Sequence, residues 1–257
     1  MDVGQSVDRS VPDMTGVCVA RLNHGPVNAL PLSAWNDVKK TVSEISDDPA
    51  IRVAVLHGGE GRFCAGADIT ELAHPPADTD PAAMLLAVDE ARAAIGEARI
   101  PVIAAIDGPA HGGGLELALA CDIRIASEQA TFAASGVNMG LIASVPSLVA
   151  AVGDTVARRM LLTGERIDAT TAQRWGLITD LADSPLDRAL AIAHTIAAKP
   201  PLAIEAARAA LRDLPTQSRE IQRSSLTDTF RHLAASEDHR EAIDAFLNKR
   251  PPTFTRE

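Results

Sequence analysis

Two short glycine-bearing segments constrain this chain more than any of its other features. Residues 63–69 read FCAGADI, and residues 108–116 read GPAHGGGLE. Each segment places small residues at a turn just before an apolar, helix-forming run. The first turn of a helix leaves backbone N–H groups without intrahelical partners, and glycine lets a ligand approach that backbone because it has no Cβ. The two turns therefore predict a pair of N–H donors that stabilise negative charge on a carbonyl oxygen, which is an oxyanion hole.

The apolar segments around these turns predict an α/β fold. Residues 17–22 and 53–56 are short, β-branched runs that end in Asn-His-Gly and His-Gly-Gly, which is typical of strands. Residues 102–106 are almost continuously apolar, which favours a strand buried on both faces, and residues 123–126 predict another strand. Residues 32–45 place apolar side chains at helical spacing. Strands that alternate with helices indicate the α/β class.

The chain divides into three predicted regions: a flexible leader over residues 1–12, a core over 13–183 and a helical region over 184–257. Ser-Pro at 184–185 is a helix start signal, with a cap residue and a proline at the first helical position. Helices are predicted over residues 81–97, 189–198, 202–214, 217–233 and 237–248. Residues 74–81 contain three prolines and two aspartates, so they predict an irregular segment, either a plain linker or a mobile substrate lid.

Composition excludes several classes of function. The 24 basic and 34 acidic residues give a net charge of −10, which argues against nucleic acid or an anionic membrane surface as the main partner. Three widely spaced cysteines favour a reducing cytosol. The sequence contains neither metal-ligand spacing nor a dinucleotide fingerprint, so we expect no metal and no redox cofactor. With no apolar signal segment and no run of about 18–20 apolar residues, a soluble, cytoplasmic protein is expected.

Five segments in the same order resemble the crotonase superfamily, also called the enoyl-CoA hydratase/isomerase family. Two of them are the glycine turns, of which the second continues as ELALACD at 116–122. The other three are PVNAL at 26–30, PVIAAI at 101–106 and the SED…AFLNKR stretch at 236–250. The resemblance implies a spiral of β-β-α turns and an acyl-CoA thioester as substrate. It also implies that the C-terminal helices join subunits into homotrimers, which often pair into hexamers.

The resemblance assigns three catalytic roles. Ala67 and Gly113 match the residues whose N–H groups form the oxyanion hole of the family. Glu116 matches the first of two glutamates in enoyl-CoA hydratases, where it orients and deprotonates the water that attacks the β-carbon. The alternative for Glu116 is a first-turn glutamate that only stabilises its own helix through the helix dipole.

The resemblance also implies a set of substrate-binding residues. Ala65, Asp68 and Ile69 flank the first predicted donor, and with Ala67 and Gly113 they match positions along the CoA thioester. Phe246 and Lys249 match C-terminal positions that approach the adenine and phosphates of CoA, sometimes across a subunit boundary. For Lys249 the alternative is an exposed charge at a helix C-terminus.

The second catalytic glutamate of the family is missing from this chain. Its position falls at Gly136, which has no side chain and cannot donate a proton, and residues 129–153 contain no Asp, Glu, His, Lys or Arg. The additional aspartate of dienoyl-CoA isomerases falls at Ser144. A positioned general acid contributes about 10²–10⁴-fold to a rate, so we expect a hydratase with weakened activity. The alternatives are a non-catalytic acyl-CoA binder, or isomerisation, decarboxylation or thioester hydrolysis.

Two other reactive residues lie in the glycine turns. His111 adjoins the glycine triplet and could titrate near neutral pH, but its position carries a packing residue in the family, so a packed or solvent-facing imidazole is favoured over a proton shuttle. Nothing beside Cys64 in the sequence suggests an activated thiolate.

Overall fold

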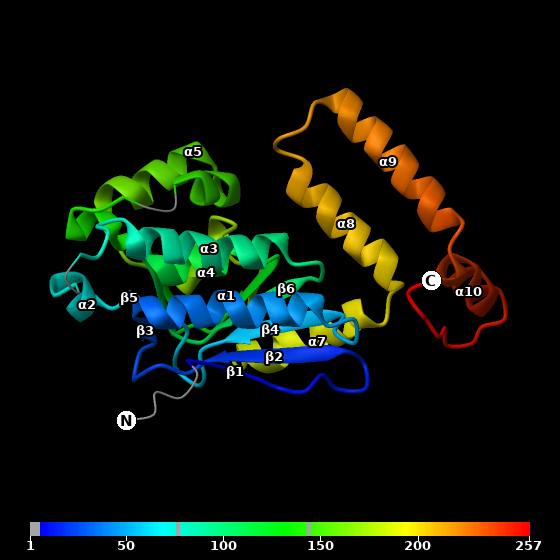
Figure 1. The fold of residues 1–257 in the computed structure, drawn as a ribbon, viewed down its shortest axis with the longest axis horizontal. Helices are drawn as coiled ribbons and strands as arrows, with labels where there is room; N and C mark the ends of the chain where they lie inside the picture. The colour runs from blue at the N-terminus through cyan, green and yellow to red at the C-terminus, as the bar shows by residue number, and fades with distance from the viewer. Residues whose placement is uncertain (1–5, 76–77, 143–144) are drawn as a thin grey trace.

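The computed structural model describes residues 6–75, 78–142 and 145–257 (Figure 1). In these ranges, a main sheet has the order β1-β2-β4-β6-β8-β11. Its strands are β1 (Val7–Arg9), β2 (Val17–Leu22), β4 (Val53–His57), β6 (Val102–Ile106), β8 (Ile123–Ala126) and β11 (Asp180–Leu181). All neighbours pair in parallel except β1, which runs antiparallel to β2. The predicted α/β class and the strands at 17–22, 53–56, 102–106 and 123–126 are confirmed.

The start of the chain corrects the predicted leader. Residues 1–5 lie outside the described ranges, but Val7–Arg9 forms β1, which lies opposite the end of β2, with Val7 opposite Leu22. Val7 is buried, and the backbone N–H of Asn23 donates to the carbonyl of Ser6. A flexible leader over residues 7–9 is therefore wrong, because one apolar side chain and the strand pairing attach this segment to the core.

Two smaller sheets hold the glycine turns. Strand β3 (Ala29–Leu30) pairs in parallel with β5 (Gly66–Ala67). In the other small sheet, β9 (Thr131–Ala133) pairs in parallel with β7 (Pro109–His111) and antiparallel with β10 (Ile167–Asp168). A single bridge between Cys64 and Ala110 connects the segments that carry the two turns. The turns are thus held side by side by backbone pairing.

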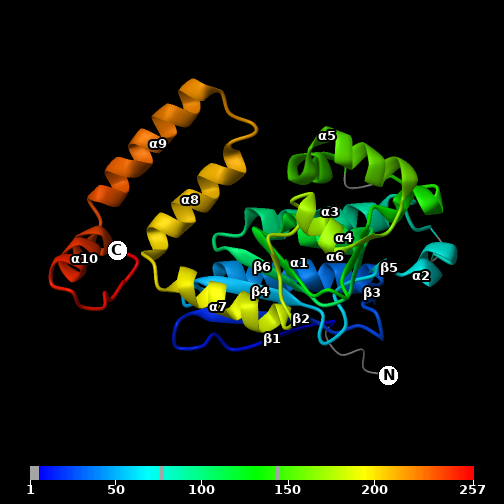
Figure 2. The same ribbon diagram turned by 180° about the vertical axis from the view of Figure 1, so that it is seen from behind.

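Helices cover both faces of the main sheet (Figures 1 and 2). Helix α7 (Pro185–Ala197) packs on one face, where Ala189, Ala193 and Ala197 join a cluster with the apolar side chains of β2, β4, β6 and β8. Helices α1 (Leu32–Asp47), α3 (Ala83–Glu97) and α4 (Gly113–Ala120) lie on the other side. The predicted boundary at residue 184 therefore changes, because α7 belongs to the packed core and the separate helical region begins after it.

Shorter elements complete the core. Helix α2 (Ile69–Ala73) follows β5, and a 3₁₀ helix, η1 (Ser135–Met139), follows β9. Helix α5 (Val145–Thr163) is kinked at Gly153, whose φ is 75°, and α6 (Ala169–Arg174) follows β10. The described residues of 74–81 form no helix or strand, as predicted, whereas residues 76–77 of that segment lie outside the described ranges.

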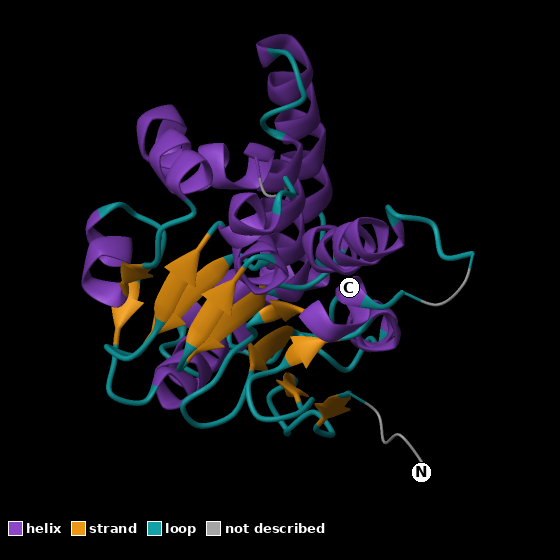
Figure 3. Ribbon diagram, turned by 90° about the vertical axis from the view of Figure 1, so that its left-hand side faces the viewer, coloured by secondary structure: helices purple, strands orange, loops and turns teal. Residues whose placement is uncertain are grey.

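The last three helices project from the core as an arm. Figures 1 and 2 show α8 (Pro201–Asp213) and α9 (Arg219–Ala234) as a hairpin, with α10 (Glu237–Leu247) beyond it, and Figure 3 shows helices that rise beyond the strands of the core. The buried Arg208 anchors α8: its Nε donates to Asp122 Oδ2 over 2.9 Å, and its Nη2 donates to the carbonyl of Ile95 over 2.7 Å. Apolar side chains of the arm stay exposed, among them Phe230 at 72%. Across the described ranges, we find no helix that is both long and apolar enough to cross a membrane.

Candidate active site

The PVNAL segment fixes the approach to the first glycine turn through Asn28. This residue is fully buried and has a φ of 52°, a conformation that asparagine tolerates better than most residues. Its side-chain amide donates to the carbonyls of Gly58, over 3.0 Å, and Phe63, over 2.8 Å, while its Oδ1 accepts from the N–H of His24. Both ends of the 58–63 loop are therefore tied to one side chain.

The N–H of Ala67 points away from the strand that pairs with β5. Asp68, the next residue, donates its N–H to the carbonyl of Leu30 over 2.9 Å. Successive N–H groups along a strand point in opposite directions, so that of Ala67 faces the other side. On Gly66, an added Cβ would lie 2.7 Å from the carbonyl oxygen of His111 and 3.4 Å from the nitrogen of Gly113. The two turns therefore meet backbone to backbone.

The glycine triplet starts α4 in a crowded place. Gly113 is the first residue of α4, so its N–H is among the donors that the helix itself does not use. An added Cβ on Gly113 would lie 2.8 Å from Cζ2 of Trp35, and one on Gly114 would lie 1.9 Å from the carbonyl oxygen of Cys64. The structure thus brings Gly66, the residue before Ala67, close to Gly113. The role of Ala67 and Gly113 as oxyanion donors remains a prediction.

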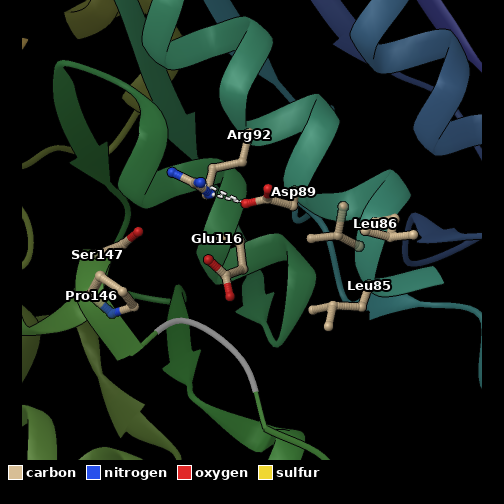
Figure 4. A pocket seen from close by; sticks show the side chains of 8 residues that line it. Leu85, Leu86, Asp89, Arg92, Glu116, Pro146 and Ser147 are labelled. Carbon is tan, nitrogen blue, oxygen red and sulfur yellow. Dashed lines mark hydrogen bonds and ion pairs between the residues drawn. The ribbon is translucent and has the colours of Figure 1, made fainter. Parts of the chain in front are cut away.

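Glu116 lies in the first turn of α4 and is only 5% exposed. Its side chain faces a cavity of about 310 Å³, which α3, α4 and the start of α5 enclose (Figure 4). The cavity is lined by Leu85, Leu86, Val88, Asp89, Arg92, Glu116, Pro146 and Ser147. A carboxylate three residues after the first donor of α4 is therefore placed beside a space that a substrate could fill.

The α3 wall of this cavity is the portion of the site that sequence analysis missed. Arg92 donates from Nε and Nη2 to Asp89 Oδ1, over 3.0 and 2.6 Å, and both side chains line the cavity (Figure 4). Leu85 and Leu86, which lie a turn earlier on α3, form the apolar surface of this wall. The signal in the sequence was the spacing of Leu85, Asp89 and Arg92, which places them on one face of the predicted helix. No feature of the neighbouring sequence indicates that this face meets Glu116.

The comparisons with known proteins agree with this geometry. The model of the family described as "Enoyl-CoA hydratase/isomerase" matches residues 13–257. The chain belongs to this family. It is 36% identical over 236 residues to 2,3-dehydroadipyl-CoA hydratase of Escherichia coli, with 88% of each chain covered. It is 36% identical over 237 residues to (E)-benzylidenesuccinyl-CoA hydratase of Thauera aromatica, covering 89% of this chain and 91% of that protein.

Solved structures extend the likeness to the fold. The crystal structure of an enoyl-CoA hydratase/isomerase from Mycobacterium abscessus superposes with a TM-score of 0.90 at 32% identity, covering 98% of this chain and 100% of that one. The predicted crotonase-type fold is confirmed.

The wall formed by residues 135–147, where the resemblance places the second acid of the family, is neutral over the residues that the structure describes. Gly136 lies in η1, and the hydroxyl oxygen of Ser135 would be 3.2 Å from a Cβ added to Gly112, so this wall adjoins the start of α4. Val137 and Met139 are 45% and 57% exposed. Ser144, the other predicted position on this wall, lies outside the described residues. The replacement of the acid by Gly136 remains a prediction.

His111 and Cys64 are structural in this member of the family. His111 forms a 3.0 Å hydrogen bond between its Nε2 and Thr131 Oγ1, and burial together with the positive charge of Arg166 lowers its pKa to about 4. Burial raises the pKa of the Cys64 thiol to about 12, so it stays protonated at neutral pH. Both findings favour the packing roles. Among the described residues, we find no group of three or more His, Cys, Asp or Glu that could hold a metal ion.

The predicted CoA-binding residues fall into two groups. Ala65, Asp68 and Ile69 flank Ala67, where Asp68 caps α2 by accepting the N–H of Thr70 and Ile69 is 61% exposed. Phe246 lies at the end of α10, 82% exposed, and the exposed Lys249 follows that helix. Helix α10 lies at the opposite end of the molecule from α2 (Figures 1 and 2). A single chain therefore does not bring this second group to Glu116.

Proposed function

We propose that this chain is an enoyl-CoA hydratase that adds water to a trans-2-enoyl-CoA to give a 3-hydroxyacyl-CoA, with fatty acid metabolism as its setting. The proposal rests on one observation: the side chain of Glu116, three residues after Gly113, is buried in the wall of a cavity. Both relatives named above are hydratases of CoA thioesters, which supports the same class of substrate here.

In the proposed hydration, the chain supplies the oxyanion donors and the base. The thioester oxygen accepts the N–H groups of Ala67 and Gly113, which stabilise the enolate as charge develops. Glu116 takes a proton from water, whose oxygen forms a bond to the β-carbon, while the electron pair of the double bond moves to the thioester oxygen. When the enolate collapses, the Cα takes a proton. Because Gly136 has no acid to supply this proton, the protonated Glu116 gives it back through a water molecule. This indirect transfer makes the reaction slow.

The exposed apolar residues of the arm support a homo-oligomer, and we propose a homotrimer or hexamer. Leu211, Leu226 and Phe230 on α8 and α9, each more than half exposed, would be covered by a second copy. In such an assembly, Phe246 and Lys249 would serve the cavity of a neighbouring subunit. We further propose that the enzyme works in the cytoplasm and needs no metal or redox cofactor, since coenzyme A enters only as a portion of the substrate.

The test of the function is Glu116→Gln. We expect wild-type protein to hydrate crotonyl-CoA, followed as loss of the conjugated thioester absorbance, and the variant to lose about 10²–10⁴-fold in kcat. Gln keeps the size of the side chain, so acyl-CoA binding measured by isothermal titration should persist. Glu128→Gln is the control, because Glu128 is exposed and does not line the cavity.

Gly136 favours one second candidate, a non-catalytic acyl-CoA binder that kept the donors and lost the acid. In that case, wild type and Glu116→Gln would show the same trace turnover while both bind acyl-CoA. Turnover to another product would instead indicate isomerisation, decarboxylation or thioester hydrolysis.

A further inference from the structure

The wall of the cavity formed by α3 carries an ion pair that the proposed hydration does not use. Arg92 gives two of its N–H groups, on Nε and Nη2, to a single oxygen, Asp89 Oδ1. Guanidinium has five N–H donors, so this contact leaves the Nη1 side of Arg92 for another acceptor. The side chains of Arg92 and Asp89 are 36% and 58% exposed, so water reaches both.

This pair makes one side of the cavity unsuitable for a plain alkyl chain. Leu85, Leu86 and Val88 offer an apolar surface, but Asp89 and Arg92 continue the same face of α3. An alkyl group lying on them would remove water from two charged side chains and replace none of the hydrogen bonds, which is costly. An acyl group that ends in a carboxylate would instead replace that water with a charge-assisted bond to the guanidinium.

The charges around the cavity give such a carboxylate one binding position. Among the described residues that line it, Arg92 is the only cation, while Asp89 and Glu116 are the acidic groups and Ser147 and Pro146 from α5 carry no charge. Asp89 occupies only the Nε and Nη2 side of Arg92, where it competes with a substrate carboxylate for the positive charge of the guanidinium. A second negative group in the substrate is therefore stabilised only at Arg92, and repulsion keeps it away from Glu116.

We propose that Arg92 is a specificity-determining residue that selects CoA thioesters whose acyl group carries a carboxylate at the end remote from the thioester. The inference rests on the proposed function, because it places the acyl group in the cavity beside Glu116. It adds the substrate class: the CoA monothioester of an unsaturated dicarboxylic acid, held by its thioester oxygen at one end and by Arg92 at the other.

The test compares substrates of equal length with and without the second carboxylate. Hydration of trans-2-hexenedioyl-CoA and trans-2-hexenoyl-CoA, and of the corresponding eight-carbon pair, is measured for wild type and Arg92→Met. We expect wild type to prefer the carboxylate-ended substrate in kcat/KM. Arg92→Met should reduce that preference about 10- to 100-fold, the size expected for a lost hydrogen bond to a charged group. A preference that is absent in wild type at both lengths, or unchanged in the variant, overturns the proposal.

Two further variants make the result specific. Arg158→Met is the matched control: Arg158 also pairs with an aspartate on its own helix, Asp154, but it does not line the cavity. Its preference should equal that of wild type. Asp89→Asn removes the competing carboxylate and should increase the preference, so it tests the idea even if Arg92→Met folds poorly. An Asp89→Asn variant that lowers the preference counts against the proposal.

Binding of saturated analogues separates this inference from the hydratase proposal. Adipyl-CoA and hexanoyl-CoA cannot be hydrated, and isothermal titration measures their affinities directly. If no enoyl-CoA is hydrated but adipyl-CoA binds more tightly and loses that advantage in Arg92→Met, the hydratase proposal fails and the inference stands. If hydration proceeds but Arg92→Met leaves the ratio of the two affinities unchanged, the inference fails and the hydratase proposal stands.

Discussion

Two walls of the candidate site differ in how well their packing tolerates the substitution of a side chain. In the glycine wall, residues 64–67 and 111–114, an added Cβ on Gly66 or Gly114 would lie 2.7 or 1.9 Å from a backbone oxygen. In the neutral wall, the described residues of 135–147, Leu141 and Ile142 are 55% and 75% exposed. Close backbone packing leaves no room for a side chain on Gly66 or Gly114, whereas exposure makes the second wall tolerant of substitution. The difference predicts that the neutral wall, where the acid of the family is expected, tolerates changes that the glycine wall does not.

The largest effect should follow a change in the glycine wall. We expect Gly114→Ala to lower the free energy of unfolding by about 3 kcal/mol, because the new methyl group would press the carbonyl of Cys64 out of place. Displacing the adjacent donors should also cost about 10²-fold or more in hydration rate. Thermal unfolding and the crotonyl-CoA assay measure the two effects.

Gly96→Ala is the control for this change. Gly96 lies in α3, and nothing lies within 4 Å of an added Cβ there. Since alanine is a better helix former, this variant should gain up to about 1 kcal/mol. A Gly114→Ala protein as stable and as active as wild type would remove the distinction between the two walls.

A smaller effect, and a gain, should follow a change in the neutral wall. Gly136→Glu places a carboxyl group where the resemblance predicts the acid of the family, and the 3₁₀ backbone of η1 is one that glutamate adopts readily. We expect crotonyl-CoA hydration to rise about 10- to 100-fold, less than a fully positioned acid gives, with little change in thermal stability. The rate is compared with that of wild type under identical conditions.

Val137→Glu is the matched control, since it adds the same charge one residue further along η1 at an exposed side chain. Equal gains in both variants would show that charge rather than position matters. No gain in Gly136→Glu, with acyl-CoA binding intact, would show that the missing acid does not limit turnover.

The smallest effect should come from His111, which lies at the edge of the glycine wall. Its pKa in the folded protein is about 4, below the ordinary value of 6.5, because of burial and the charge of Arg166. As the pH falls below 6.5, the unfolded chain takes up a proton that the folded chain does not, so stability declines until the pH reaches about 4.

His111→Gln removes this decline. Between pH 7 and 4.5, we expect wild type to lose about 2–4 °C more in Tm than the variant. His232→Gln, at an exposed position on α9, is the control and should behave as wild type. If His111→Gln and wild type decline in parallel, the imidazole is not held neutral by its surroundings.

Local signals predicted most of the regular structure. Ser184 and Ser236 accept N–H groups of Asp187 and His239 and so cap α7 and α10. Helix α10 begins at the predicted residue, and α7 begins at the predicted Ser-Pro start signal, four residues before the predicted range of 189–198. Strands β3, β5 and β7 were not predicted, because a strand of two or three residues exists only through its partner. Helix α5 was not predicted either, since glycine at its kink interrupts an apolar run without a clear cap.

The sequence by itself determined the two turns, the order of the motifs and the residue types that carry the chemistry. A glycine conformation or a helix cap depends on neighbours in the chain, so these features can be read locally. Only the tertiary structure decided that Gly66 and Gly113 meet, that α10, which carries Phe246, lies away from α4, and that Arg92 lines the same cavity as Glu116. A cavity forms where helices distant in the sequence pack together, and no local pattern specifies which of their faces will meet.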